Sequence, residues 1–179
     1  GALIYQSGEC VLFAFSICGI GLMASILGIL VSRESKAANP QNALNIGTYV
    51  AGAITVVAAG VLSQMIFGDL RAFGAVSAGL VCGMAIGKIT EIYTSGDYSH
   101  VKNIAHQSET GPATTLISGM AVGMYSTVWP SVFIAFGMLV SYYIMGGASN
   151  ALLGLYGISL AAVGMLSTTG ITVAVDAYG

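Results

Sequence analysis

The side chains that could carry chemistry in this sequence are few, and one carboxylate stands out. Asp176 comes at the end of a long apolar segment that is uncharged from Ala151 onward. A carboxylate in such a position can bind a hard cation such as Mg²⁺ or take part in a proton path. It can also lie in water at the end of a helix. The spacing of the residues alone leaves these three interpretations open.

A second charged pair lies in the middle of the chain. Lys88 and Glu91 are three residues apart, so they share one face of a helix and can form an ion pair. Because a lone charge at the bilayer centre costs about 2.5–3.5 kcal/mol, we expect the pair near a helix end, either paired together or bonded to neighbouring helices. His100 and His106, without a nearby cysteine, do not have the spacing of a zinc site.

The composition sets the class of protein. Hydrophobic residues make up 56% of the 179 residues and charged residues only 7%, against about 25% charged residues in soluble domains. About 20 apolar residues cross a bilayer as a helix. We therefore predict an all-α, polytopic transmembrane bundle with five spanning helices, at about residues 8–31, 44–67, 72–93, 113–145 and 151–178. The net charge of −2 and the lack of a basic patch exclude nucleic-acid binding.

The distribution of basic residues predicts the orientation. With five spans, one basic residue falls on one side of the membrane and four on the other: Arg71 against Arg33, Lys36, Lys88 and Lys102. Basic residues favour the cytoplasmic side. We therefore expect the loops at about residues 32–43 and 95–111 in the cytoplasm, together with Asp176.

Glycine spacing and helix length predict how the spans pack. Small residues four apart allow close helix contacts in lipid, so we expect packing faces at Gly79, Gly83 and Gly87 and at Gly119 and Gly123. The fourth span would be about 50 Å long as a straight helix, against a hydrocarbon core of about 30 Å. We expect this span to project from the membrane and to bend near Pro130.

Three segments together resemble the membrane-integral pyrophosphatases. Residues 87–95 read Gly-Lys-Ile-Thr-Glu-Ile-Tyr-Thr-Ser, residues 110–114 read Thr-Gly-Pro-Ala-Thr, and residues 175–179 read Val-Asp-Ala-Tyr-Gly. The family patterns at these places are Thr-Glu-Tyr-Tyr-Thr-Ser, Thr-Gly-Ala-Ala-Thr and a motif that begins Asp-Ala-Tyr-Gly. The resemblance is close from about residue 79 to residue 179. It departs at Ile92, where the family has an aromatic residue, and at His100, where proline is usual.

This resemblance implies a function. The whole protein would be a sixteen-helix homodimer that hydrolyses pyrophosphate with Mg²⁺, with K⁺ as a further candidate ion, and pumps H⁺ or Na⁺. Its location would be a prokaryotic plasma membrane or an acidic organelle membrane. The present chain would be an interior piece, inactive alone, in which the fourth span lies at the dimer interface and Asp176 matches the first aspartate of the site motif.

Two alternatives to a pyrophosphatase remain. An ion-coupled secondary carrier also uses carboxylates within the membrane. A purely structural helix bundle would need no chemistry from Asp176. Apart from the resemblance, the sequence has no phosphate-binding glycine loop and no paired catalytic carboxylates.

Overall fold

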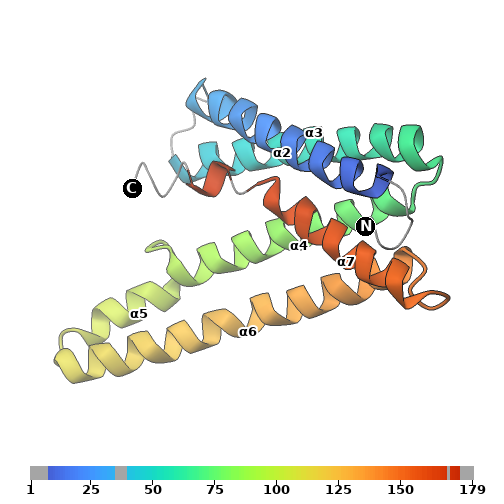
Figure 1. Ribbon diagram of the computed structural model, residues 1–179. Coiled ribbons are helices and arrows are strands. Elements are labelled where there is room, and N and C mark those ends of the chain that lie inside the picture. The colour runs from blue at the N-terminus through green and yellow to red at the C-terminus, as the bar shows by residue number, and fades with distance from the viewer. Residues whose placement is uncertain (1–7, 35–39, 169, 174–179) are drawn as a thin grey trace. The chain divides into compact units, whose positions relative to one another are not determined.

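The computed structural model describes residues 8–34, 40–168 and 170–173. This part of the chain is helical and contains no strand, which confirms the all-α prediction. The helices, labelled in Figure 1, are α2 (Glu9–Glu34), α3 (Pro40–Phe67), α4 (Arg71–Thr94), α5 (Ser99–Gln107), α6 (Pro112–Ile144) and α7 (Ala151–Leu166).

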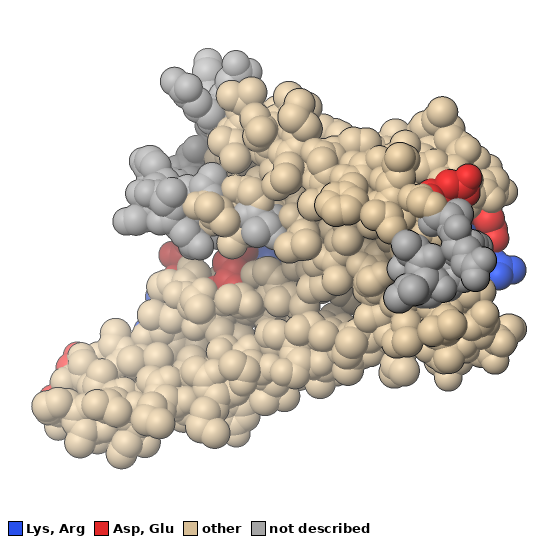
Figure 2. Space-filling model, viewed as in Figure 1, with Lys and Arg blue, Asp and Glu red and all other residues tan. Residues whose placement is uncertain are grey.

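Within the described residues, five stretches are long and apolar enough to cross a membrane. They are Glu9–Ser32, Ala43–Phe67, Arg71–Gln107, Pro112–Ile144 and Ala151–Val173. Large apolar side chains point outward from them, for example Phe15, Met65 and Met124, whose exposed fractions are 75%, 77% and 70%. The face shown in Figure 2 is almost wholly uncharged, and acidic and basic side chains appear only in small groups. Such a surface suits lipid rather than water.

The chain divides into two compact units. The first contains the described residues up to Gly83 and from Gly137 onward, and the second is Met84–Phe136. In the first unit α2 packs along α3 and contacts α7 (Figure 1). Its core includes Phe13 and Ile17 of α2, Val76 of α4 and Leu160 of α7, all fully buried.

Glycine lets the helices of the first unit approach closely. A Cβ atom on Gly28 of α2 would lie 2.6 Å from the carbonyl oxygen of Gly47 in α3. A Cβ atom on Gly79 of α4 would overlap the backbone of Ala161 in α7. Glycine is therefore required at these contacts, as expected for helices held together in lipid by close packing.

The contacts within the first unit also fix the helix directions. The hydroxyl of Tyr156, early in α7, donates to the carbonyl of Cys10, early in α2, and Ser167 meets Ser25 further along both helices. These two helices are therefore parallel. α4 runs in the same general direction as α7 in Figure 1, and the two helices cross where Gly79 lies against Ala161 and Val76 lies against Gly164.

α7 ends earlier than the predicted span. The prediction was a helix over residues 151–178, but α7 ends at Leu166, a turn follows at Ser167 and Thr168, and helical residues resume at 170–173. The hydroxyls of Ser167 and Thr168 bond back to the carbonyls of Gly164 and Met165. The same kind of bond occurs inside unbroken helix, for example from Ser159 to the carbonyl of Tyr156 in α7, so these bonds accompany the interruption without explaining it. Residues 174–179 lie outside the described part of the chain.

In the second unit the predicted polar loop at residues 95–111 contains a helix. α5 places Val101 and Ile104 on a half-buried side, whereas Lys102 and His106 are exposed. The loop prediction rested on polarity, but a short amphipathic helix also accommodates polar residues on its outer side. In α6, Pro130 lies inside the helix and does not end it.

Candidate functional site

The approach to Asp176 is described, whereas Asp176 itself lies outside the described residues. α7 and the helical residues 170–173 lead toward it. Because α7 is parallel to α2, the chain leaves α7 at the end of the first unit where α2 also ends. α4 runs the same way through this unit before it enters the connector. In a chain with five successive spans, the first, third and fifth spans run in the same direction, as α2, α4 and α7 do here.

The structure brings Lys88 and Glu91 together near the C-terminal end of α4. Their Nζ and Oε2 atoms are 3.0 Å apart, and the two side chains are 48% and 13% exposed. An ion pair that is partly exposed in this way contributes only about 0–1 kcal/mol. The pair therefore contributes little to the stability of the fold.

Two features of the connector were missed by sequence reasoning. His100 of α5 stacks on Tyr93 of α4, with ring centroids 4.7 Å apart. Thr110 and Thr114 bond each other at 2.9 Å, and both hydroxyls also bond the carbonyl of Gln107. The run of threonines around Gly111 and Pro112 was a usable signal for such a cap. The stack had no signal, because it depends on the geometry of the short turn between α4 and α5.

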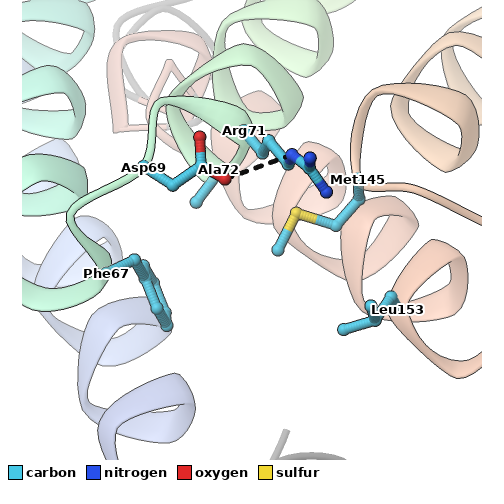
Figure 3. Close-up of a pocket in the computed structure, with 6 residues that line it drawn as sticks. All are labelled: Phe67, Asp69, Arg71, Ala72, Met145 and Leu153. Atoms are coloured by element: carbon cyan, nitrogen blue, oxygen red, sulfur yellow. Dashed lines mark ion pairs between the residues drawn. The ribbon is translucent and has the colours of Figure 1, made fainter.

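A small hollow lies at the turns that join α3 to α4 and α6 to α7 (Figure 3). Its volume is about 150 Å³. The lining residues are Phe67, Asp69, Arg71, Ala72, Met145 and Leu153. The Arg71 Nε atom pairs with the Asp69 carboxylate at 3.1 Å, but both side chains are more than half exposed. The hollow is therefore the setting of a surface ion pair.

The predicted glycine faces differ in what they touch. A Cβ atom on Gly83 would meet Met165 of α7 at 3.5 Å, and Gly79 is in tighter contact with Ala161. In contrast, no atom of the described chain lies within 4 Å of a Cβ position on Gly87, Gly119 or Gly123. For these three, close packing stays a prediction about partners beyond the described helices.

The described residues contain no group of three or more His, Cys, Asp or Glu side chains that could hold a metal ion. A metal site involving Asp176 would thus need ligands from the undescribed residues or from elsewhere in the complete protein.

Comparison with known proteins gives consistent matches along the chain. It is 65% identical over 179 residues to a putative K⁺-stimulated pyrophosphate-energized sodium pump of Clostridium tetani, covering 100% of this chain and 27% of that protein. It is 40% identical over 169 residues to a K⁺-insensitive pyrophosphate-energized proton pump of Methanosarcina mazei, covering 94% and 25%.

A third relative extends the comparison to another organism. The chain is 33% identical over 179 residues to a K⁺-stimulated pyrophosphate-energized sodium pump of Thermotoga maritima, covering 92% of this chain and 23% of that protein. The chain thus spans about a quarter of the length of these curated relatives. The profile of the family described as "Inorganic H+ pyrophosphatase" matches residues 1–179. With its membrane-length helices, this multi-pass membrane chain therefore belongs to the inorganic H⁺ pyrophosphatase family.

Proposed function

We propose that this chain is part of a membrane pump that hydrolyses pyrophosphate on the cytoplasmic side and moves H⁺ or Na⁺ across the bilayer. The observation that carries the proposal is the family match over all 179 residues, together with relatives named as pyrophosphate-energized pumps. A secondary carrier is not favoured, because none of these relatives is named as one.

The helix directions support the proposed topology. α2, α4 and α7 run the same way through the first unit, so the chain leaves all three at one end. The first loop, the connector and the segment that leads to Asp176 follow these three helices. These directions and the positive-inside bias support our proposal that Asp176 lies on the cytoplasmic side.

Asp176 is the residue of this chain proposed to act on pyrophosphate. Pyrophosphate is strongly anionic, so a carboxylate can hold it only through a cation between them. When bound, Mg²⁺ neutralises phosphate charge and polarises a phosphoryl oxygen. Since the described residues hold no metal cluster, Asp176 would share the ion with side chains from other segments. The whole site is thus completed by the rest of the protein.

The transported ion and the response to K⁺ follow from the relatives in our proposal. The relative that is 65% identical over 179 residues is named a putative K⁺-stimulated sodium pump, whereas the one that is 40% identical over 169 residues is named a K⁺-insensitive proton pump. We therefore expect Na⁺ transport and K⁺ stimulation. Sodium-dependent charge movement in vesicles, measured with and without K⁺, tests this assignment.

The proposed oligomer is a homodimer in which α6 contributes to the interface. α6 exposes an unusual amount of apolar surface, including Met120, Met124 and Tyr125, which are 63%, 70% and 70% exposed. Gly119 and Gly123 lie on the same stretch and leave room for a close neighbour. A second copy of the protein is the partner that this proposal assigns to α6.

The central test uses the full-length protein in vesicles. Asp176→Asn keeps the size of the side chain and removes its charge, so Mg²⁺-dependent phosphate release should fall at least about tenfold, as when a metal site is perturbed. Asp69→Asn is the matched control, because Asp69 lies in the surface ion pair with Arg71. It should retain activity.

Two results would contradict the proposal in different ways. Unchanged phosphate release in Asp176→Asn would refute the role assigned to this residue, but the proposal that the protein is a pyrophosphate-driven pump would still hold. Ion transport driven by a gradient, with no release of phosphate from pyrophosphate by the wild-type protein, would favour the carrier.

A further inference from the structure

The hollow at the two turns lies where membrane spans end. Phe67 is the last residue of α3 and Arg71 the first of α4, while Met145 follows α6 and Leu153 lies in the first turn of α7. All four belong to the first unit. Because each of these helices is part of a stretch that is long and apolar enough to cross a membrane, the hollow lies at the level of the lipid headgroups, where the hydrocarbon core ends.

The walls of the hollow combine apolar side chains with one ion pair. Figure 3 shows Asp69 and Arg71 on one side, Phe67 and Leu153 on the other, and the Met145 side chain between them. Sites for small molecules commonly have this composition, with a mainly apolar lining and a few polar groups that fix the orientation of the ligand. The apolar wall suits hydrocarbon, and the ion pair suits a charged headgroup.

Both charged groups of the ion pair retain capacity for further bonds. The pair joins Nε of Arg71 to Oδ2 of Asp69 at 3.1 Å, and the two side chains are 61% and 55% exposed. A guanidinium has five N–H donors and a carboxylate has two acceptor oxygens, so this contact uses only part of either group. A Cβ atom on Gly146 would lie 3.4 Å from Nη1 of Arg71, so glycine leaves room beside this nitrogen.

The ion pair can exchange partners at little cost, because an exposed pair of this kind contributes little stability. A phosphate group can accept two parallel N–H bonds from one guanidinium. An ammonium group can donate to the carboxylate. A ligand with a phosphate and an ammonium group a few atoms apart therefore matches both Arg71 and Asp69, whereas an anion without the ammonium group would be repelled by Asp69.

We propose that the hollow binds the headgroup of a phospholipid that carries a primary ammonium group, as phosphatidylethanolamine does. Arg71 binds the phosphate, Asp69 accepts hydrogen bonds from the ammonium group, and the apolar wall packs against the beginning of the acyl chains. A lipid is the occupant because the hollow lies at the boundary of the hydrocarbon core. The site takes no part in pyrophosphate hydrolysis, so Asp69→Asn changes the lipid preference and leaves phosphate release unchanged.

The test uses the purified full-length protein in detergent, with one lipid added at a time. Hydrogen exchange is measured in peptides covering residues 67–73 and 145–153. Phosphatidylethanolamine should slow exchange in both peptides at concentrations about tenfold lower than phosphatidylglycerol, which has no ammonium group. Phosphatidylcholine should also need higher concentrations, because its quaternary ammonium group has no N–H to donate to Asp69.

Charge variants assign the two contacts. Arg71→Gln removes the phosphate contact and should raise the required concentration of phosphatidylethanolamine at least about tenfold. Asp69→Asn should bring the concentrations required for phosphatidylethanolamine and phosphatidylglycerol close together. Lys102→Gln and Asp97→Asn, which remove the same charges from exposed positions of the connector, are the matched controls and should retain the wild-type preference.

A second pair of variants changes the shape of the hollow and keeps its charges. Leu153→Trp fills the hollow and should remove the protection by phosphatidylethanolamine. Leu152→Trp, at a neighbouring position that is 52% exposed and does not line the hollow, should keep it. Thermal unfolding checks that both variants are folded.

Three results would overturn the inference. The first is equal protection of the two peptides by phosphatidylethanolamine and phosphatidylglycerol in the wild-type protein. The second is protection by phosphatidylethanolamine that persists unchanged in Arg71→Gln. The third is protection by free phosphoethanolamine at the same concentration as the lipid, which would assign the site to a soluble compound instead of a membrane lipid.

Discussion

Replacing Gly79 by alanine should separate α4 from α7. Gly79 is buried, and the Cβ atom that alanine adds would lie 2.6 Å from both the Cα and the carbonyl carbon of Ala161. Carbon atoms that are not bonded pack best at about 3.5–4.0 Å. Because the obstacle is backbone rather than the tip of a flexible side chain, the two helices must move apart by about 1 Å.

The energetic effect follows from that displacement. A gap of about 0.5–1 Å forfeits about a quarter to a half of the attraction between the atoms that face it. The packing of Val76 against Gly164, on the same pair of helices, is weakened in the same way. Overpacking of this kind costs about 1–3 kcal/mol. The intrinsic preference of alanine over glycine in a helix, about 1 kcal/mol, offsets part of this cost.

The assay is thermal unfolding of the full-length protein in detergent, with Gly119→Ala as the matched control. For Gly79→Ala we expect Tm to fall by about 2 °C or more. For Gly119→Ala, where nothing lies within 4 Å of the added atom, we expect Tm to stay the same or rise. Equal Tm values for the two variants would refute the close contact between α4 and α7.

Two further predictions concern α6 and the turn that follows it. The first uses a protein in which the native cysteines Cys10, Cys18 and Cys82 are replaced. In it, Met124→Cys should give a cross-linked dimer, whereas Met65→Cys, at a position on α3 that is 77% exposed, should not. Failure to obtain a cross-linked dimer from cysteines at several α6 positions would count against the proposed interface. Gly146→Ala should lower stability by about 1–2 kcal/mol, because φ is +89° there and the added atom would lie 3.4 Å from Nη1 of Arg71. Gly96→Ala, without such a neighbour, should be neutral in the same unfolding assay.

Local patterns were enough to predict the helices and the class of protein. The fourth span was expected at residues 113–145, and α6 is Pro112–Ile144. Helices of this kind are readable because each depends on a continuous apolar run and on the polar residues at its ends. The ion pair of Lys88 and Glu91 is local too, since three residues of helix bring the two side chains together.

The end of the fifth span depends on more than local pattern. The span was expected at about residues 151–178, a candidate span covers Ala151–Val173, and within it α7 ends at Leu166. The hydroxyls of Ser167 and Thr168 were visible in the sequence. The carbonyl of Ser167 accepts a hydrogen bond from Ser25, which lies 142 residues away, so local pattern could not predict this contact.

By itself, then, the sequence determined a membrane-spanning helical chain and its family resemblance, because these depend on composition and on neighbours a few residues apart. Only the tertiary structure decided which glycines lie where two helices touch. Gly79 and Gly119 have similar settings in the sequence, but Gly79 meets the backbone of α7 and Gly119 meets nothing in the described chain. Spacing of small residues permits a close approach, and the arrangement of the helices determines where one occurs.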